Sequence, residues 1–149
     1  MFKKIIFSAL ITCAMTVEAE ELKTFVEVSD ALSRGSELVF VMDFKECRGT
    51  YSFTNVKVSV KPNALMLVSD KYIKASDQHF TLNNPGFSGN PVIDYGRYTI
   101  KADGSVEIDM TILSAKGYQE LRKYLSTCEL GKSFQVFDQK RIHKAPGIT

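Results

Sequence analysis

Residues 98–112 have the sequence YTIKADGSVEIDMTI, which is the clearest structural signal in the chain. At its centre is Asp103-Gly104, a dipeptide typical of the tight turn between two antiparallel strands. After the turn, apolar and polar residues alternate as they do in a strand with one buried face. The residues expected to face the core are Val106, Ile108, Met110 and Ile112, and those expected to face outward are Glu107, Asp109 and Thr111. The stretch therefore predicts a β-hairpin.

Other segments on both sides of this hairpin have strand patterns. Residues 38–44 are apolar at odd and even positions, which indicates a central strand buried on both faces. Residues 56–61 alternate valine with lysine or serine, which predicts a strand with one buried face. Most connections are too short for crossover helices, so the strands are expected to pair antiparallel. Further short strands are predicted at residues 64–68, 79–82 and 134–137, with a long loop at residues 83–91.

Two short helices complete the expected fold. Residues 28–34 precede Gly35, a residue type that commonly ends helices, and Ser29 is placed to cap the first turn. A second helix is predicted over residues 118–125 from apolar residues at helical spacing. These residues are Tyr118, Leu121, Tyr124 and Leu125. The predicted fold class is therefore mainly β, of the α+β type, with a single antiparallel sheet and two short helices. Residue alternation does not distinguish an open sheet from one curled into a small barrel.

The N-terminus has the pattern of a secretory signal peptide. It begins with two lysines, continues with the mainly apolar residues 5–17 and ends in a small-residue cleavage pattern at Ala19. A membrane-spanning helix would need roughly 18 apolar residues without interruption, and this run stops at Glu18. We therefore expect a signal peptide at residues 1–19, no stable membrane anchor, and a protein that is periplasmic or secreted.

The rest of the chain, residues 20–149, has the length of one domain, with a flexible polar tail from about residue 140. Removal of the signal peptide also removes Cys13 and leaves Cys47 and Cys128 as the only cysteines. Export would carry this pair into an oxidising compartment, where disulfides form and persist. The sequence therefore predicts one disulfide, between Cys47 and Cys128.

The net charge and the available side chains argue against several classes of function. The formal net charge of +2 is too small to indicate a nucleic-acid partner. Two histidines, one of them in the tail, and a disulfide-bound cysteine pair leave too few ligands for zinc. Glu107 and Asp109 are spaced as an acid–base pair could be, but a solvated outer strand face is the simpler interpretation. We predict no cofactor, no metal and no catalytic residue.

The residues that we select as a candidate binding patch are Asp77, His79, Phe80 and Phe87. The interpretation we favour for His79 is a half-exposed strand residue that hydrogen-bonds a neighbour. The alternative is a hydrolase in which Asp77 orients His79 towards a serine such as Ser76 or Ser88. Phe87 is an aromatic residue on a long loop rich in glycine and proline, where it could contact a partner or pack onto the core.

Several segments in combination resemble the VirK family of exported, virulence-associated bacterial proteins. These segments are residues 30–35, residues 40–44 with Cys47, residues 77–81, residues 89–98 leading into Asp103-Gly104, and Cys128. The resemblance implies export, two cysteines in corresponding places and a role in virulence or host interaction, with no reaction mechanism. We therefore expect a non-enzymatic binding module whose partner is an unknown protein. The alternative is a barrel-type carrier of a small apolar ligand.

Overall fold

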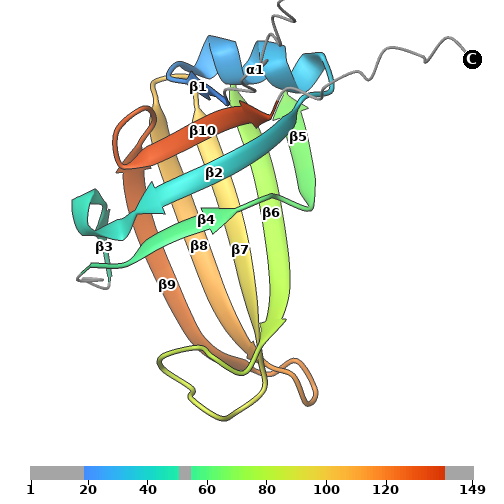
Figure 1. Cartoon of the computed structure of the whole chain (residues 1–149), viewed down its shortest axis with the longest axis vertical. Coiled ribbons are helices and arrows are strands. Elements are labelled where there is room, and N and C mark those ends of the chain that lie inside the picture. The colour runs from blue at the N-terminus through green and yellow to red at the C-terminus, as the bar shows by residue number, and fades with distance from the viewer. Residues whose placement is uncertain (1–18, 51–54, 140–149) are drawn as a thin grey trace, which may run out of the picture.

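A computed structural model describes residues 19–50 and 55–139, which form two antiparallel sheets and one α-helix (Figure 1). The predicted tail and all but the last residue of the predicted signal peptide lie outside the described residues. The elements, in chain order, are β1 (Glu20–Leu22), α1 (Phe25–Ser33), β2 (Glu37–Asp43), the 3₁₀ helix η1 (Phe44–Glu46), β3 (Arg48–Gly49), β4 (Lys57–Val60), β5 (Ala64–Val68), β6 (Tyr72–Thr81), β7 (Val92–Lys101), β8 (Ser105–Ser114), β9 (Glu120–Glu129) and β10 (Phe134–Gln139).

The larger sheet has six strands in the order β3-β9-β8-β7-β6-β5. Its centre is the hairpin of β7 and β8, in which Ile100 pairs with Val106 across the Asp103-Gly104 turn. The predicted hairpin is therefore confirmed. Val106, Ile108 and Ile112 are buried as expected, because every second residue of β8 faces the core.

The smaller sheet has the order β1-β10-β2-β4 and crosses in front of the long strands in the view of Figure 1. The prediction of a single sheet is therefore wrong. The prediction that residues 38–44 form a central strand is confirmed, because β2 pairs with both β10 and β4. Burial on both faces is not observed. Only one face of β2 packs into the core, and Val39 and Val41 on the other face stay half-buried.

Helix α1 begins earlier than predicted, because Thr24 rather than Ser29 caps it. The Thr24 hydroxyl accepts a hydrogen bond from the Glu27 amide, and the Glu27 carboxylate accepts one from the Thr24 amide. This reciprocal pair satisfies amide groups that the first turn of a helix leaves without partners. The helix lies at one end of the two sheets (Figure 1) and buries Phe25, Val28 and Ala31. No helix among the described residues has the length and apolarity needed to cross a membrane.

The second predicted helix is wrong, since residues 120–129 form strand β9. This segment pairs with β8 over almost its whole length, and Val106 lies opposite Cys128. Tyr118, with φ of +57°, belongs to the turn that precedes the strand. The helical spacing of the apolar residues is outweighed here by the inter-strand pairing with β8, which no local pattern reveals.

The space between the two sheets is filled by side chains. Phe40 contacts Tyr98 and Phe134, with ring centroids 5.6 and 4.9 Å apart, and the Tyr98 and Phe134 rings are 6.1 Å apart. Aliphatic side chains from both sheets surround these rings, among them Leu38, Met42, Ile73, Ile100, Val106 and Ile108. Among the described residues each sheet keeps two edge strands, so of the two arrangements that the sequence left open, an open sheet and a small closed barrel, the sheets adopt the open one.

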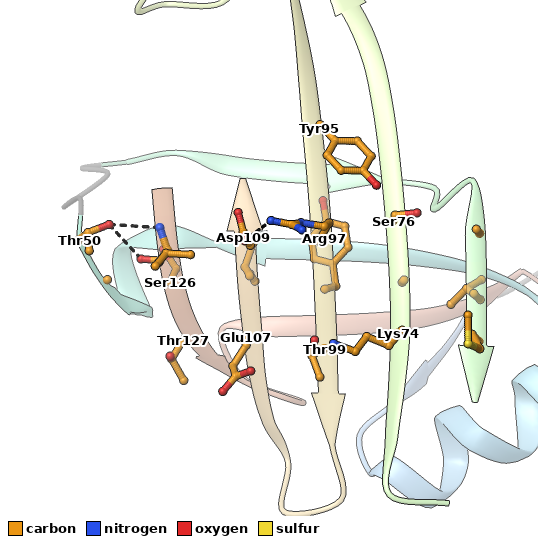
Figure 2. Close-up of a pocket in the computed structure, with 18 of the residues that line it drawn as sticks. Thr50, Lys74, Ser76, Tyr95, Arg97, Thr99, Glu107, Asp109, Ser126 and Thr127 are labelled. Atoms are coloured by element: carbon orange, nitrogen blue, oxygen red, sulfur yellow. Dashed lines mark hydrogen bonds and ion pairs between the residues drawn. The ribbon is translucent and has the colours of Figure 1, made fainter. Parts of the chain in front are cut away.

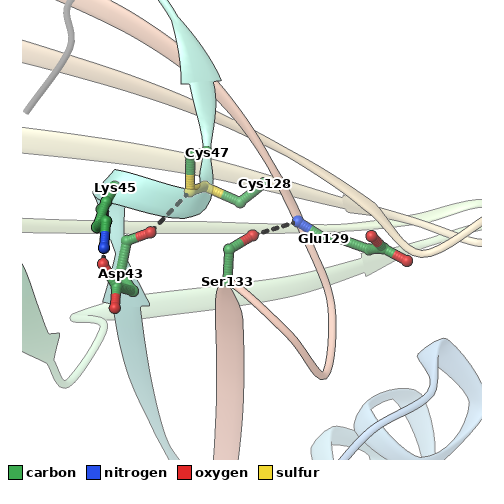
Figure 3. The surroundings of a disulfide bond; sticks show 6 residues. All are labelled: Asp43, Lys45, Cys47, Cys128, Glu129 and Ser133. Carbon is green, nitrogen blue, oxygen red and sulfur yellow. Dashed lines mark hydrogen bonds between the residues drawn. A yellow bond between two sulfur atoms is a disulfide. The ribbon is translucent and has the colours of Figure 1, made fainter.

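The predicted disulfide between Cys47 and Cys128 is confirmed (Figure 3). It links the residue that follows η1 to strand β9, and so connects the end of the smaller sheet's β2 to the larger sheet. Hydrogen bonds order the chain on both sides. The Lys45 amide donates to Asp43 at 3.2 Å, and the Glu129 amide donates to the Ser133 hydroxyl at 2.9 Å.

Candidate functional site

Two residues of the predicted patch, Asp77 and His79, lie on the core-facing side of β6. Ile73 and Ala75, which precede them at alternate positions on the same strand, are buried. The Asp77 carboxylate accepts a hydrogen bond of 2.6 Å from the Tyr98 hydroxyl. A small crevice of about 300 Å³ next to both residues is lined on its other side by Ser59, Val60 and Lys61 at the end of β4.

Gly96 makes room for the bond between Asp77 and Tyr98. It pairs with Asp77 across the strands, and a Cβ atom added at Gly96 would lie 2.5 Å from the Tyr98 hydroxyl and 2.7 Å from the carboxylate oxygen of Asp77. The Tyr98 ring is held by Phe40 and Phe134, so it has little freedom to move away.

We therefore expect Gly96→Ala to lower the free energy of unfolding by about 2 kcal/mol, from overpacking and from loss of a partly buried hydrogen bond. Chemical denaturation measures this change. The double variant Gly96→Ala with Tyr98→Phe removes the hydroxyl that the new methyl group meets, so its loss should be smaller than the sum of the two single losses. Additive losses would show that contact with the Tyr98 hydroxyl is not the cause.

The ionisation of Asp77 is perturbed by its surroundings. Burial raises the pKa of the Asp77 carboxyl above its ordinary value, and the hydrogen bond from Tyr98 offsets part of that rise. Burial and the neighbouring carboxylate likewise raise the pKa of the Tyr98 hydroxyl, which keeps the phenol protonated as the donor. The folded protein therefore binds the Asp77 proton more tightly than the unfolded chain does.

This shift predicts a pH dependence of stability. As the pH rises above 3.8, the ordinary value for aspartate, the contribution of Asp77 to the free energy of unfolding should fall until the carboxyl is ionised in the folded state. Asp77→Asn keeps an acceptor for Tyr98 but does not titrate. The stability of Asp77→Asn relative to the wild type should therefore increase from pH 3.5 to pH 7 in thermal denaturation. A constant or decreasing difference would contradict the shift.

His79 contacts a different aspartate from the one expected. Its Nε2 atom lies 3.4 Å from the carboxylate of Asp94, which also accepts a hydrogen bond of 2.9 Å from the Asn84 side chain. Asn84 belongs to the loop between β6 and β7, so Asp94 connects this loop to the sheet. Ser76 lies on the opposite face of β6 from His79, so the proposed pairing of these two residues in a hydrolase is not possible.

The two phenylalanines of the predicted patch do not lie together. Phe80 points to the outer face of the larger sheet and is 62% exposed. Phe87 is half-buried beneath Arg122, whose guanidinium carbon lies 5.3 Å from the ring centroid. Of the four selected residues, only Asp77 and His79 are therefore neighbours on one face. The described residues include no cluster of three or more histidine, cysteine, aspartate or glutamate side chains that could hold a metal ion.

A second concave site among the described residues is an open groove of about 930 Å³ on the outer face of the larger sheet, the face away from the smaller sheet (Figure 2). We call it the outer groove. Its floor is formed by β6, β7 and β8, with β5 along one side and β9 and β3 along the other. At the β3 side the Thr50 hydroxyl accepts a hydrogen bond from the Leu125 amide at 3.1 Å. The labelled lining side chains are Thr50, Lys74, Ser76, Tyr95, Arg97, Thr99, Glu107, Asp109, Ser126 and Thr127.

The acidic residues of the outer groove are paired with cations. Asp109 contacts both Arg97 and Lys123, the latter at 3.2 Å, and Glu107 contacts Lys101 at 2.5 Å. The ion pair with Glu107 raises the pKa of Lys101. Glu107 and Asp109 therefore lie on a solvated outer face, as the simpler interpretation had it, and each is neutralised by a cation.

The outer groove could not be predicted from the sequence. Its residues come from alternate positions of separate strands, and Lys74, Arg97 and Asp109 are brought together only by the register of β6, β7 and β8. The one local signal is the run of polar residues at the outward positions of β8. That signal marks a solvated face but does not show that the face is concave.

The chain is similar in sequence to a known protein family and to two uncharacterized proteins. A family model described as VirK protein matches residues 21–118. An uncharacterized protein of Sinorhizobium fredii is 28% identical over 129 residues, covering 83% of this chain and 86% of that protein. A second uncharacterized protein, from Rhizobium radiobacter, is 24% identical over 101 residues, covering 66% and 68%.

A solved structure is also similar. The crystal structure of a VirK family protein from Legionella pneumophila aligns with a TM-score of 0.75 and 38% sequence identity, covering 78% of this chain and 98% of the other. The sequence match, the two-sheet fold and this structural likeness agree with one another. The chain belongs to the VirK family.

Proposed function

We propose that this chain is an exported, non-enzymatic binding protein and that the outer groove holds its ligand. The observation that carries the proposal is the groove itself, a concavity of about 930 Å³ lined by side chains from six strands of one sheet. Ligand sites in proteins typically have volumes of roughly 300–1,000 Å³ and combine apolar surface with a few placed polar groups. A site built on paired strands is also rigid, which limits the entropy lost when a ligand binds.

Export is supported by the leader pattern of residues 1–19 and by the Cys47–Cys128 disulfide, a bond that forms mainly outside the cytosol. A periplasmic or secreted location would give the outer groove access to envelope or host molecules. The resemblance to virulence-associated VirK proteins supports a role in contact with a host.

A binding role is favoured over hydrolysis by the arrangement of His79. The histidine contacts Asp94, and the serine nearest in sequence faces the other side of the sheet. The alternative of an apolar-ligand carrier has less support, because the Phe40, Tyr98 and Phe134 rings fill the space between the sheets.

Native mass spectrometry of protein purified from its own envelope fraction tests the proposal. We expect a mature chain that begins at Glu20, contains the disulfide and carries a non-covalent ligand. The variant Thr99→Trp places an indole on the groove floor and should lose the ligand. Lys116→Trp, in the turn between β8 and β9, should retain it and serves as the matched control. Equal ligand content in Thr99→Trp and the wild type would exclude the outer groove as the site.

A further inference from the structure

We infer that the ligand of the outer groove is a single-chain amphiphile with an acidic headgroup, a carboxylate or a phosphate, and that Lys74, Ser76 and Thr99 hold this headgroup. The inference rests on the proposed function, because it names the class of molecule that the same groove takes.

Positive and negative side chains lie on different strands of the outer groove. The outward positions of β5, β6 and β7 carry no acidic residue, whereas both acids of the groove are on β8. The outward residues on these three strands are Ala64, Met66 and Val68 on β5; Tyr72, Lys74, Ser76, Gln78 and Phe80 on β6; and Ile93, Tyr95, Arg97, Thr99 and Lys101 on β7. This half of the face is therefore positive and favours a negatively charged group.

Of the cationic side chains on β6 and β7, Lys74 is the one that can bind an incoming anion. Arg97 and Lys101 already pair with the two acids of β8. No ion pair joins Lys74 to any described residue, and its ammonium lies 5.4 Å from the centroid of the Tyr72 ring. Lys74 therefore has a charge and hydrogen-bond donors that an incoming anion can use without breaking an existing pair.

Side chains with hydroxyl groups lie beside Lys74. Thr99 is the cross-strand partner of Lys74, and Ser76 is the next outward residue on the same strand. Figure 2 shows the Lys74 side chain extending towards Thr99 and the Tyr95 hydroxyl directed towards β6. An ammonium group with two neighbouring hydroxyls supplies several donors to one oxyanion, which is the arrangement that carboxylate and phosphate groups accept.

Apolar side chains are exposed at both sides of the groove. Met66 on β5 is 60% exposed and Leu125 on β9 is 48% exposed, and both line the groove. Met66 is the cross-strand partner of Lys74, so a hydrocarbon chain whose headgroup binds Lys74 can cover Met66 and remove that apolar surface from water. An acidic peptide fits less well, because the backbone groups of the floor strands are paired within the sheet and cannot add hydrogen bonds to a new strand.

The test uses four soluble ten-carbon probes below their micelle concentrations: decanoate, decyl phosphate, decanol and decylamine. Isothermal titration calorimetry at low salt should show saturable binding of one or both acidic probes, at least tenfold tighter than binding of decanol or decylamine. If decanoate binds more tightly, the headgroup is a carboxylate, and if decyl phosphate does, it is a phosphate.

Variants locate the contact. Lys74→Gln should weaken binding of the preferred acidic probe about tenfold or more, and Thr99→Val should weaken it less, because a neutral hydrogen bond is weaker than a charge-assisted one. Lys116→Gln makes the same charge change in a distant exposed turn and should leave affinity unchanged. All three substitutions are at exposed or half-exposed positions, so circular dichroism should show the wild-type fold.

The inference is overturned if decanol binds as tightly as the acidic probes, if Lys74→Gln and Lys116→Gln have equal effects, or if no acidic probe binds. Recovery of a neutral ligand, or of a protein partner, that Thr99→Trp displaces would overturn the inference about the headgroup while leaving the proposed function intact. A ligand that Thr99→Trp does not displace would overturn both.

Discussion

Replacing both disulfide cysteines, Cys47→Ala with Cys128→Ala, should lower the free energy of unfolding by about 4 kcal/mol. The two cysteines are separated by 81 residues, so the bond closes a long loop and strongly restricts the unfolded chain. In the folded protein the bond also connects the end of the β2 segment to β9. A loss of this size is comparable to the net stability of a small domain, so we expect the variant to be partly unfolded at 37 °C.

Urea denaturation under non-reducing conditions measures the loss. The wild type with a reductant provides a control, since it should lose a similar amount of stability, whereas the double alanine variant should not respond to reductant. If the wild type and the variant unfold at the same urea concentration, the bond does not stabilise the fold. Alanine is preferred to serine because Cys128 is buried, and a hydroxyl at that position would add a desolvation cost.

The disulfide could be predicted from sequence because it required only counting. Removal of the predicted leader would leave two cysteines, and the predicted export to an oxidising compartment then allows only one pairing. The hairpin at residues 98–112 was equally accessible, because its turn and both of its strands are contiguous in the chain. In both cases the information needed is local or combinatorial and does not depend on how distant segments pack.

Strand β9 and the outer groove show where such reasoning stops. Leu121 and Leu125 are spaced as on one face of a helix, yet both belong to strand β9, which pairs with β8. The hydrogen-bond ladder that decides between these structures joins residues in two segments, and neither segment shows it alone. The groove depends on more segments, because its lining residues come from six strands. The register of β6, β7 and β8 sets the distance between Lys74 and the two acids of β8.

Asp77 and His79 are an intermediate case, because the sequence indicated these two residues but not their partners. Asp77 and His79 were selected from the sequence for one binding patch, but the predicted strand, residues 79–82, contained only His79. In the structure both residues lie on the same face of β6. Their partners, Tyr98 and Asp94, come from the adjacent strand and were not identified. Gly96 carried a usable signal, since a glycine inside a strand often marks a close approach of other atoms.

Phe40→Ala should lower the free energy of unfolding by about 3–5 kcal/mol, as is typical when a fully buried phenylalanine is truncated. Phe40 is 0% exposed and lies on β2 of the smaller sheet, where its ring contacts both Tyr98 of the larger sheet and Phe134 of β10. Truncation leaves a cavity between the sheets that the flanking strands cannot close without breaking their hydrogen-bond ladders. It also removes the packing that positions Tyr98, and with it the hydroxyl that bonds Asp77.

The matched control is Phe80→Ala, which removes the same side chain from a strand position that is 62% exposed. Its effect on unfolding should be within about 0.5 kcal/mol, because little packing is lost at the surface. The difference between the two variants therefore measures burial between the sheets, separately from any change in strand propensity. If both variants lose equal stability, the two sheets are not held together by this aromatic contact. Phe40→Ala could lose much stability while its free energy of unfolding still falls with urea concentration at the wild-type slope. That result would show that the two sheets still unfold as one cooperative unit.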